Sequence, residues 1–184
     1  MKATDQLKAE HQGIKIMLQI LQAVSNQCGR GESMHPEHLA GIMEFLTVFV
    51  DKCHHGKEEE FLFPALEAAG VPREGGPIGV MLSEHEQGRK LVAQIKNATS
   101  RYTSGDQKSA ADVQLTIRQY VDLLTQHIEK ENQILFAMAD ARLDSNKDRE
   151  LFEAFEQLEK ERIGPGKHEE FHALLDQLQG AYLK

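Results

Sequence analysis

The chain has 184 residues and a formal net charge of -8, which argues against a nucleic-acid partner or an anionic membrane, because both need a basic surface. No apolar run approaches the roughly 20 residues that a membrane span needs, and the charged N-terminus is unlike a signal peptide, so we expect a cytoplasmic protein. Apolar residues make up 40% of a chain with few prolines and no tryptophan, which favours a folded, mostly helical protein.

Apolar residues recur at three- and four-residue steps through most of the chain, which predicts amphipathic helices. The first runs over about residues 4–27 and ends at a Gly-rich stretch, and the second begins at Pro36 and extends towards residue 66. A Gly- and Pro-rich loop at 70–77 precedes a third helix over about 78–102, and a polar turn precedes a fourth over about 107–141. Four such helices with short loops predict an all-α fold, an antiparallel up-down four-helix bundle.

Two shorter helical patterns follow, over residues 148–163 and 167–183, with Gly-Pro-Gly between them. Neither buries enough area to be stable alone. We therefore expect residues 1–144 to form the bundle and residues 145–184 to form a C-terminal extension of two additional helices packed on it. Cys28 and Cys53 have no C-x-x-C spacing and are interpreted as free thiols.

The nine histidines are unusual, and part of their pattern is repeated. A shift of 74 residues places the Glu-His pair at 10–11 over that at 84–85, and a shift of 73 places residues 54–58 over 127–131. Each half therefore offers one His on its first helix and a His-x-x-x-Glu on its second. Positions i and i+4 lie one helical turn apart, so both side chains can reach the same ion. Imidazole with carboxylate suits iron, and the two oxygens of a carboxylate can bridge two ions.

His55 and Glu59 are also spaced four apart and form a rival pair. Under the 73-residue shift their counterparts are Ile128 and Asn132, which cannot bind a metal in that role. We therefore expect His55 and Glu59 either to face solvent or to support the ligands from outside.

A surface role is the alternative to a metal site. A single helical His is more often a surface residue than a ligand, and a lone His-x-x-x-Glu can be a surface pair that contributes a few tenths of a kcal/mol. Two copies, each with a further His at a matching distance, are hard to explain in that way. Six ionisable groups directed at one core would also be costly to bury without a metal. The sequence therefore predicts a metal site formed by His11, His54, Glu58, His85, His127 and Glu131.

With these residues in view, the chain resembles the hemerythrin-like (HHE cation-binding) family over about residues 4–142. The matching motifs are His-x-x-Lys-Glu followed by Leu-Phe in both halves, Pro64 after the first copy, and Glu-His near the start of the first and third helices. The resemblance implies a four-helix bundle with a non-haem centre of two iron ions and a bridging oxo or hydroxo group. By position it implies that the four histidines are terminal ligands and that Glu58 and Glu131 bridge the irons.

The chain departs from the resemblance at one position. Oxygen-carrying members have a second His four residues after the third-helix ligand, where this chain has Arg89. Either one iron keeps an open position or another His supplies a seventh ligand. His35 and His38 are expected at one end of the bundle, whereas the Gly-Pro-Gly turn could fold His168 and His172 back over it. We therefore predict His168 as a metal ligand; the alternative is that His168 packs at the surface and Arg89 pairs with a carboxylate.

Three functions fit such a centre. The first is binding of O2 or a related small ligand, in oxygen or nitric oxide binding, sensing or stress protection. The second is a di-iron peroxidase or ferroxidase, and the third is iron storage or donation, including repair of damaged iron centres. Repair members of the family carry an additional Cys-containing N-terminal domain, and sensors are usually fused to a signalling domain. Neither domain is evident in this sequence, which favours O2 binding or stress protection over the other functions. Mn or Zn could occupy the same His and Glu site in place of iron.

Overall fold

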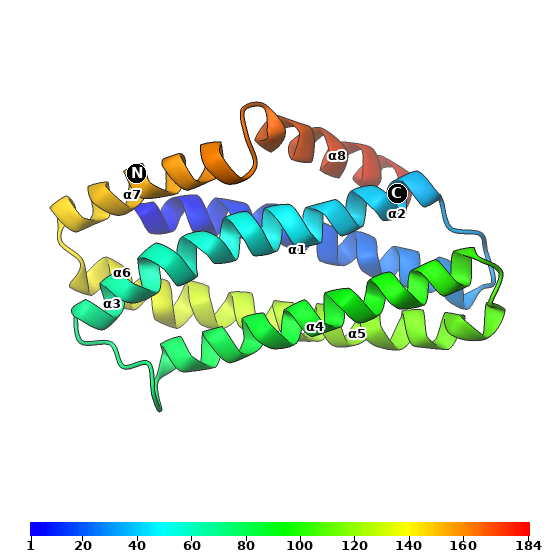
Figure 1. The fold of residues 1–184 in the computed structure, drawn as a ribbon, viewed down its shortest axis with the longest axis horizontal. Coiled ribbons are helices and arrows are strands. Elements are labelled where there is room, and N and C mark those ends of the chain that lie inside the picture. The colour runs from blue at the N-terminus through cyan, green and yellow to red at the C-terminus, as the bar shows by residue number, and fades with distance from the viewer.

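The computed structural model describes residues 1–184, and its four long helical rods form the antiparallel bundle that the sequence predicts (Figure 1). The first rod is α1 (Ala3–Gly29), and the third is α4 (Pro77–Thr103). The second runs without a break through four segments: α2 (Pro36–Glu44), η1 (Phe45–His55), η2 (Glu58–Leu62) and α3 (Phe63–Ala68). The fourth is made of η3 (Gln107–Ser109), α5 (Ala110–Lys130), η4 (Glu131–Leu135) and α6 (Phe136–Arg142).

The second and fourth rods widen into π-helix at equivalent places, because η2 begins at Glu58 and η4 begins at Glu131. Pro64 follows η2 in the first turn of α3, but its counterpart after η4 is Ala137. The proline is therefore not the cause of the π-helical turns. Short π-helical segments inside α-helices are frequent at functional sites, and here the short segments η2 and η4 each begin at one of the repeated glutamates. The longer π-helical segment η1 has no counterpart in the fourth rod, where α5 is α-helical.

The C-terminal helices α7 (Ser145–Arg162) and α8 (Lys167–Tyr182) lie lengthwise along one side of the bundle, next to α1 and the second rod (Figure 1). A short turn with left-handed backbone at Gly164 and Gly166, whose φ angles of 83° and 78° favour glycine, separates the two helices, which follow one another along the bundle (Figure 1). The helices approach closely: a Cβ on Gly41 would lie 2.9 Å from Leu174 Cδ1. The division into a bundle and an extension remains a prediction.

The apolar core consists of two clusters separated by a polar band. One contains 24 buried residues and the other 13, and α8 contributes to the first while α7 contributes to the second. Along α1 the second cluster ends at Leu7 and the first begins at Ile14, and the buried Glu10 and His11 fall between them. The repeated histidines and glutamates therefore lie inside the bundle, between two apolar layers that keep water away.

Both cysteines are buried free thiols, as the sequence suggests. No helix is long and apolar enough to cross a membrane.

Candidate metal centre

The first group of converging side chains joins α1, the second rod and the fourth rod. His11 and His54 point their Nε2 atoms at each other across 3.0 Å. Glu131 Oε2 lies 3.1 Å from His11 Nε2, and Glu58 Oε1 lies 3.4 Å from His54 Nε2. All four side chains are buried, and each offers an atom within 4.8 Å of the others.

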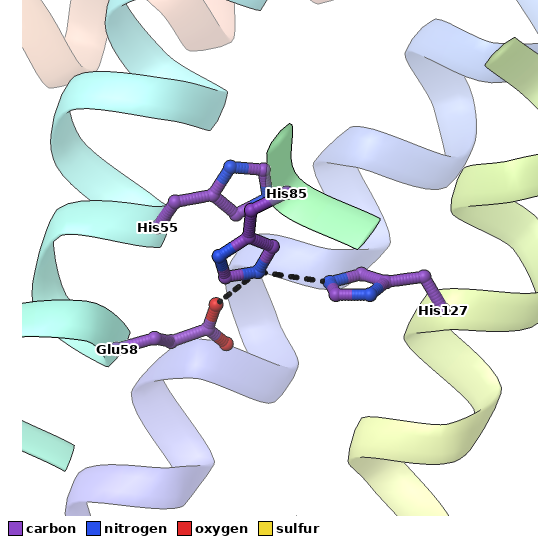
Figure 2. Close-up of side chains that lie close together, drawn as sticks. All are labelled: His55, Glu58, His85 and His127. Carbon is purple, nitrogen blue, oxygen red and sulfur yellow. Dashed lines mark hydrogen bonds and ion pairs between the residues drawn. The ribbon is translucent and has the colours of Figure 1, made fainter. Parts of the chain in front are cut away.

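The second group repeats this arrangement with α4 and α5. His85 and His127 bring their Nε2 atoms to 3.1 Å, and Glu58 Oε2 lies 3.4 Å from His85 Nε2 (Figure 2). Glu131 Oε1 lies 3.2 Å from His127 Nε2. Each glutamate therefore turns one oxygen towards each histidine pair, which is the arrangement a bridging carboxylate requires.

The far nitrogen of every one of these rings is held by an oxygen. His54 Nδ1 lies 2.7 Å from Glu10 Oε2, and His127 Nδ1 lies 2.9 Å from Glu84 Oε2. These two contacts are equivalent under the sequence repeat. In a neutral ring whose proton sits at Nδ1 and is donated to this acceptor, the unprotonated Nε2 faces the centre and is available to a metal.

The other two rings are held by residues of the opposite half. His11 Nδ1 lies 2.8 Å from Asn132 Oδ1, and His85 Nδ1 lies 2.7 Å from Glu59 Oε1. Asn132 and Glu59 are themselves counterparts under the 73-residue shift. Glu59 thus contacts one of the predicted ligands from outside the group, and Asn132 does the same in the second half.

The converging atoms fit a metal cation. Four imidazole nitrogens and the four oxygens of Glu58 and Glu131 meet in the interior, and none of those oxygens has a hydrogen-bond partner. Buried carboxylates left in this state are strongly destabilising unless a positive charge lies among them. A set of imidazoles and carboxylates suits iron, and Mn or Zn shares the preference in part.

The electrostatics of the metal-free site lead to the same conclusion. Burial lowers the pKa of His85, but the carboxylates of Glu131, Glu58 and Glu59 outweigh it and raise that pKa to about 11. Burial likewise lowers the pKa of His127, and chiefly Glu131 raises it to about 9. The site thus attracts positive charge strongly, and a binding metal ion would displace these protons.

Sequence reasoning missed most of the supporting residues, although the repeat carried the signal. Glu10 and Glu84 each precede one of the converging histidines, and Lys57 and Lys130 each precede one of the two converging glutamates. Each lysine contacts the glutamate of its own half. Their environments differ, however, because the side chain of Lys57 is 0% exposed under the C-terminal helices and that of Lys130 is 37% exposed.

His55 is buried, so it does not face solvent. Its ring stacks on that of His85 with 3.8 Å between centroids, and it belongs to the second group together with Glu58, His85 and His127 (Figure 2). Burial, with the nearby His85, holds its pKa well below the usual range. The sequence did hold a signal for this burial, because the counterpart of His55 is the apolar Ile128. A position that is apolar in one half of the repeat is expected to face the core in the other half as well.

The structure does not bring His168 to either group. Its Nδ1 lies 3.0 Å from Glu159 Oε1 and its Nε2 lies 2.8 Å from His172 Nε2, at a partly exposed place between α7 and α8. Arg89 pairs with Asp51 at 2.9 Å and with Glu59 at 2.7 Å. This is the alternative arrangement considered for these two residues. The other six predicted residues do meet.

A His and carboxylate cluster inside a four-helix bundle defines a helical cation-binding protein. Residues 2–139 match the hemerythrin HHE cation-binding domain. The chain belongs to this family, as its motifs suggest.

Several curated proteins similar to this chain are iron-sulfur cluster repair proteins. The iron-sulfur cluster repair protein YtfE of Escherichia coli O81 (strain ED1a) is 32% identical over 120 residues, which are 61% of this chain and 54% of that protein. The same values hold for the proteins of that name from Salmonella newport (strain SL254) and Salmonella agona (strain SL483). This chain therefore spans about half the length of the curated relatives it matches. No solved structure matches it.

The different burial of the two lysines predicts unequal effects of equivalent substitutions. Glu10→Ala leaves the buried Lys57 short of a partner and should lower the free energy of unfolding by about 3–5 kcal/mol. Glu84→Ala should cost only about 1 kcal/mol, because Lys130 can reach water. Urea unfolding of both variants in the presence of a chelator measures the difference. Equal losses would contradict this account of the two halves.

Proposed function

We propose that this chain holds two iron ions, one at His11 and His54 and one at His85 and His127, with Glu58 and Glu131 as bridges. The observation that carries the proposal is the division of the carboxylate oxygens. Each glutamate places one oxygen near each histidine pair, and all four oxygens lack a hydrogen-bond partner.

Such a pair of irons supplies reversible binding or activation of a small ligand such as O2, nitric oxide or a peroxide. The chain's own part is to hold the ligands and keep the site dry. Phe136 stacks on His11 with 5.4 Å between centroids, and Phe63 stacks on His85 with 5.8 Å. An apolar, dry surrounding favours a bound neutral diatomic molecule over its escape as a charged, reduced product.

Repair of iron-sulfur clusters is the second candidate function, and the printed names of the relatives favour it. A centre that binds nitric oxide or donates iron would serve that role with the same ligands. Damaged iron-sulfur proteins would then be the partners. Both roles suit the reducing cytoplasm, where Cys28 and Cys53 stay as the free thiols that are found here.

Metal analysis of variants tests the two-ion centre. The wild-type protein should contain two irons per chain, and Glu58→Ala or Glu131→Ala should lower this to less than one, because each removes a ligand from both ions. His168→Ala, which removes a side chain that belongs to neither group, should keep two irons and serves as the control. A wild-type content of one iron, or full loading of the glutamate variants, would contradict the proposal.

Spectroscopy and a repair assay separate the two roles. Exposure of the reduced protein to air should produce an absorption band that disappears under vacuum if O2 is carried. Incubation with an enzyme whose [4Fe–4S] cluster has been damaged by nitric oxide should restore that enzyme's activity if the role is repair. Metal-free protein and Glu58→Ala are the controls in both. Failure of both assays with fully loaded protein would leave the small-ligand and repair functions refuted.

A further inference from the structure

His55 is a buried polar member of the second group that the two-iron centre proposed above does not use. Its Nδ1 has no hydrogen-bond partner, although Asp51 Oδ1 lies 3.5 Å away. Its ring stacks on His85 at 17° between planes, and its ligand atom lies within 4.8 Å of those of Glu58 and His127. The ring therefore stands at the edge of the second group, with a ring nitrogen within reach of the other ligand atoms and with Nδ1 unpartnered.

The equivalent position of the other half shows what packing alone would place there. Ile128 is buried in the larger apolar cluster, so an aliphatic side chain fits this position in the helix. An imidazole without hydrogen bonds in the same place is costly to bury. A cation next to the ring would offset that cost, and the second group is the place where a cation fits.

We propose that His55 is an additional ligand of the ion held by His85 and His127. This inference rests on the proposed two-iron centre. It gives that ion five protein ligands, whereas the ion at His11 and His54 has four. The two ions are then chemically different, and a small exogenous ligand is directed to the His11–His54 side, where a position stays free.

His55→Ile is the sharpest test, because the repeat itself shows that isoleucine is accommodated. In the wild-type protein, X-ray absorption should count five histidines over two irons, and Mössbauer spectra should show two distinct iron sites. In His55→Ile the count should fall to four, the two sites should become more alike, and affinity for one iron should fall at least about tenfold. His172→Ala is the control and should leave every signal unchanged.

Two outcomes separate failure of this inference from failure of the proposed function. A wild-type protein that binds fewer than two irons would overturn both. A wild-type protein with two irons, together with a His55→Ile variant whose histidine count, Mössbauer spectrum and iron affinity are unchanged, would overturn only the role of His55. Circular dichroism of the variant shows whether the helices are intact.

A second, independent observation concerns the C-terminal helices. Hydrogen bonds connect α7 to a ligand histidine: Glu159 Oε2 accepts from Lys57 Nζ at 3.0 Å, Lys57 also donates to Glu10, and Glu10 accepts from His54. His168 on α8 lies against the other oxygen of Glu159. The equivalent series in the other half is shorter, because Lys130 contacts Glu84 and its side chain is partly exposed.

We infer that Glu159 is a positioning residue for the metal centre. Lys57 donates hydrogen bonds to both Glu159 and Glu10. The negative charge of Glu159 therefore weakens the pull of the lysine's positive charge on the electrons of the Glu10 carboxylate. Glu10 in turn sets how much electron density His54 offers the ion. The C-terminal helices thereby tune one ion and leave the other alone, given the two-iron centre proposed above.

The reduction potential of the iron-loaded protein tests this inference. Glu159→Gln should raise the potential, because Lys57 then draws more charge from Glu10 and the oxidised iron is less stabilised, and Glu159→Asp should restore most of it. Glu60→Gln is the matched control. Glu60 pairs at 2.5 Å with Arg162, which lies on α7 like Glu159, but Glu60 contacts none of the proposed ligands. An unchanged potential in Glu159→Gln, or an equal rise in Glu60→Gln, would overturn the role of Glu159. Iron content below two in the wild type would instead count against the centre itself.

Discussion

The structure depends on two carboxylates, Glu58 and Glu131, that are fully buried and whose oxygens have no hydrogen-bond partner. Their four oxygens face four imidazole nitrogens, and an oxygen atom lies against the far nitrogen of each ring. Such a group of acceptors is unfavourable in an apolar interior unless cations lie among them. The metal therefore belongs to the stability of the bundle as much as to its function, since binding and folding are coupled.

Two-fold repetition explains how one short motif builds this centre. A Glu-His on one helix and a His-x-x-Lys-Glu on the next form half of it, and each half supplies an outer partner to the other through Asn132 or Glu59. The halves are not identical. His55 stands beside the His85–His127 pair where the other half has Ile128, and the C-terminal helices bury Lys57 on the side of the His11–His54 pair. These two differences give the two histidine pairs unequal surroundings.

The helices and six converging residues could be predicted from the sequence because both depend on local spacing. Helical periodicity fixes which residues share a face, and the repeat distinguishes His54 and Glu58 from the rival pair at 55 and 59. The same comparison misled for His55. Ile128 at the equivalent position argues against a ligand role common to both halves. The same isoleucine also indicates that the position is buried, and His55 does lie inside the bundle.

The sequence by itself determined the bundle, the family motifs and the residues that meet at its centre, because each follows from the order of residues within one or two helices. Only the tertiary structure decided how histidines outside the repeated pattern are used. His168 lies four residues from His172 on one helix face, but the turn at Gly164 and Gly166 directs that face towards Glu159. The docking of α7 and α8 depends on contacts between segments over 100 residues apart, such as Lys57 with Glu159, and no local pattern encodes them.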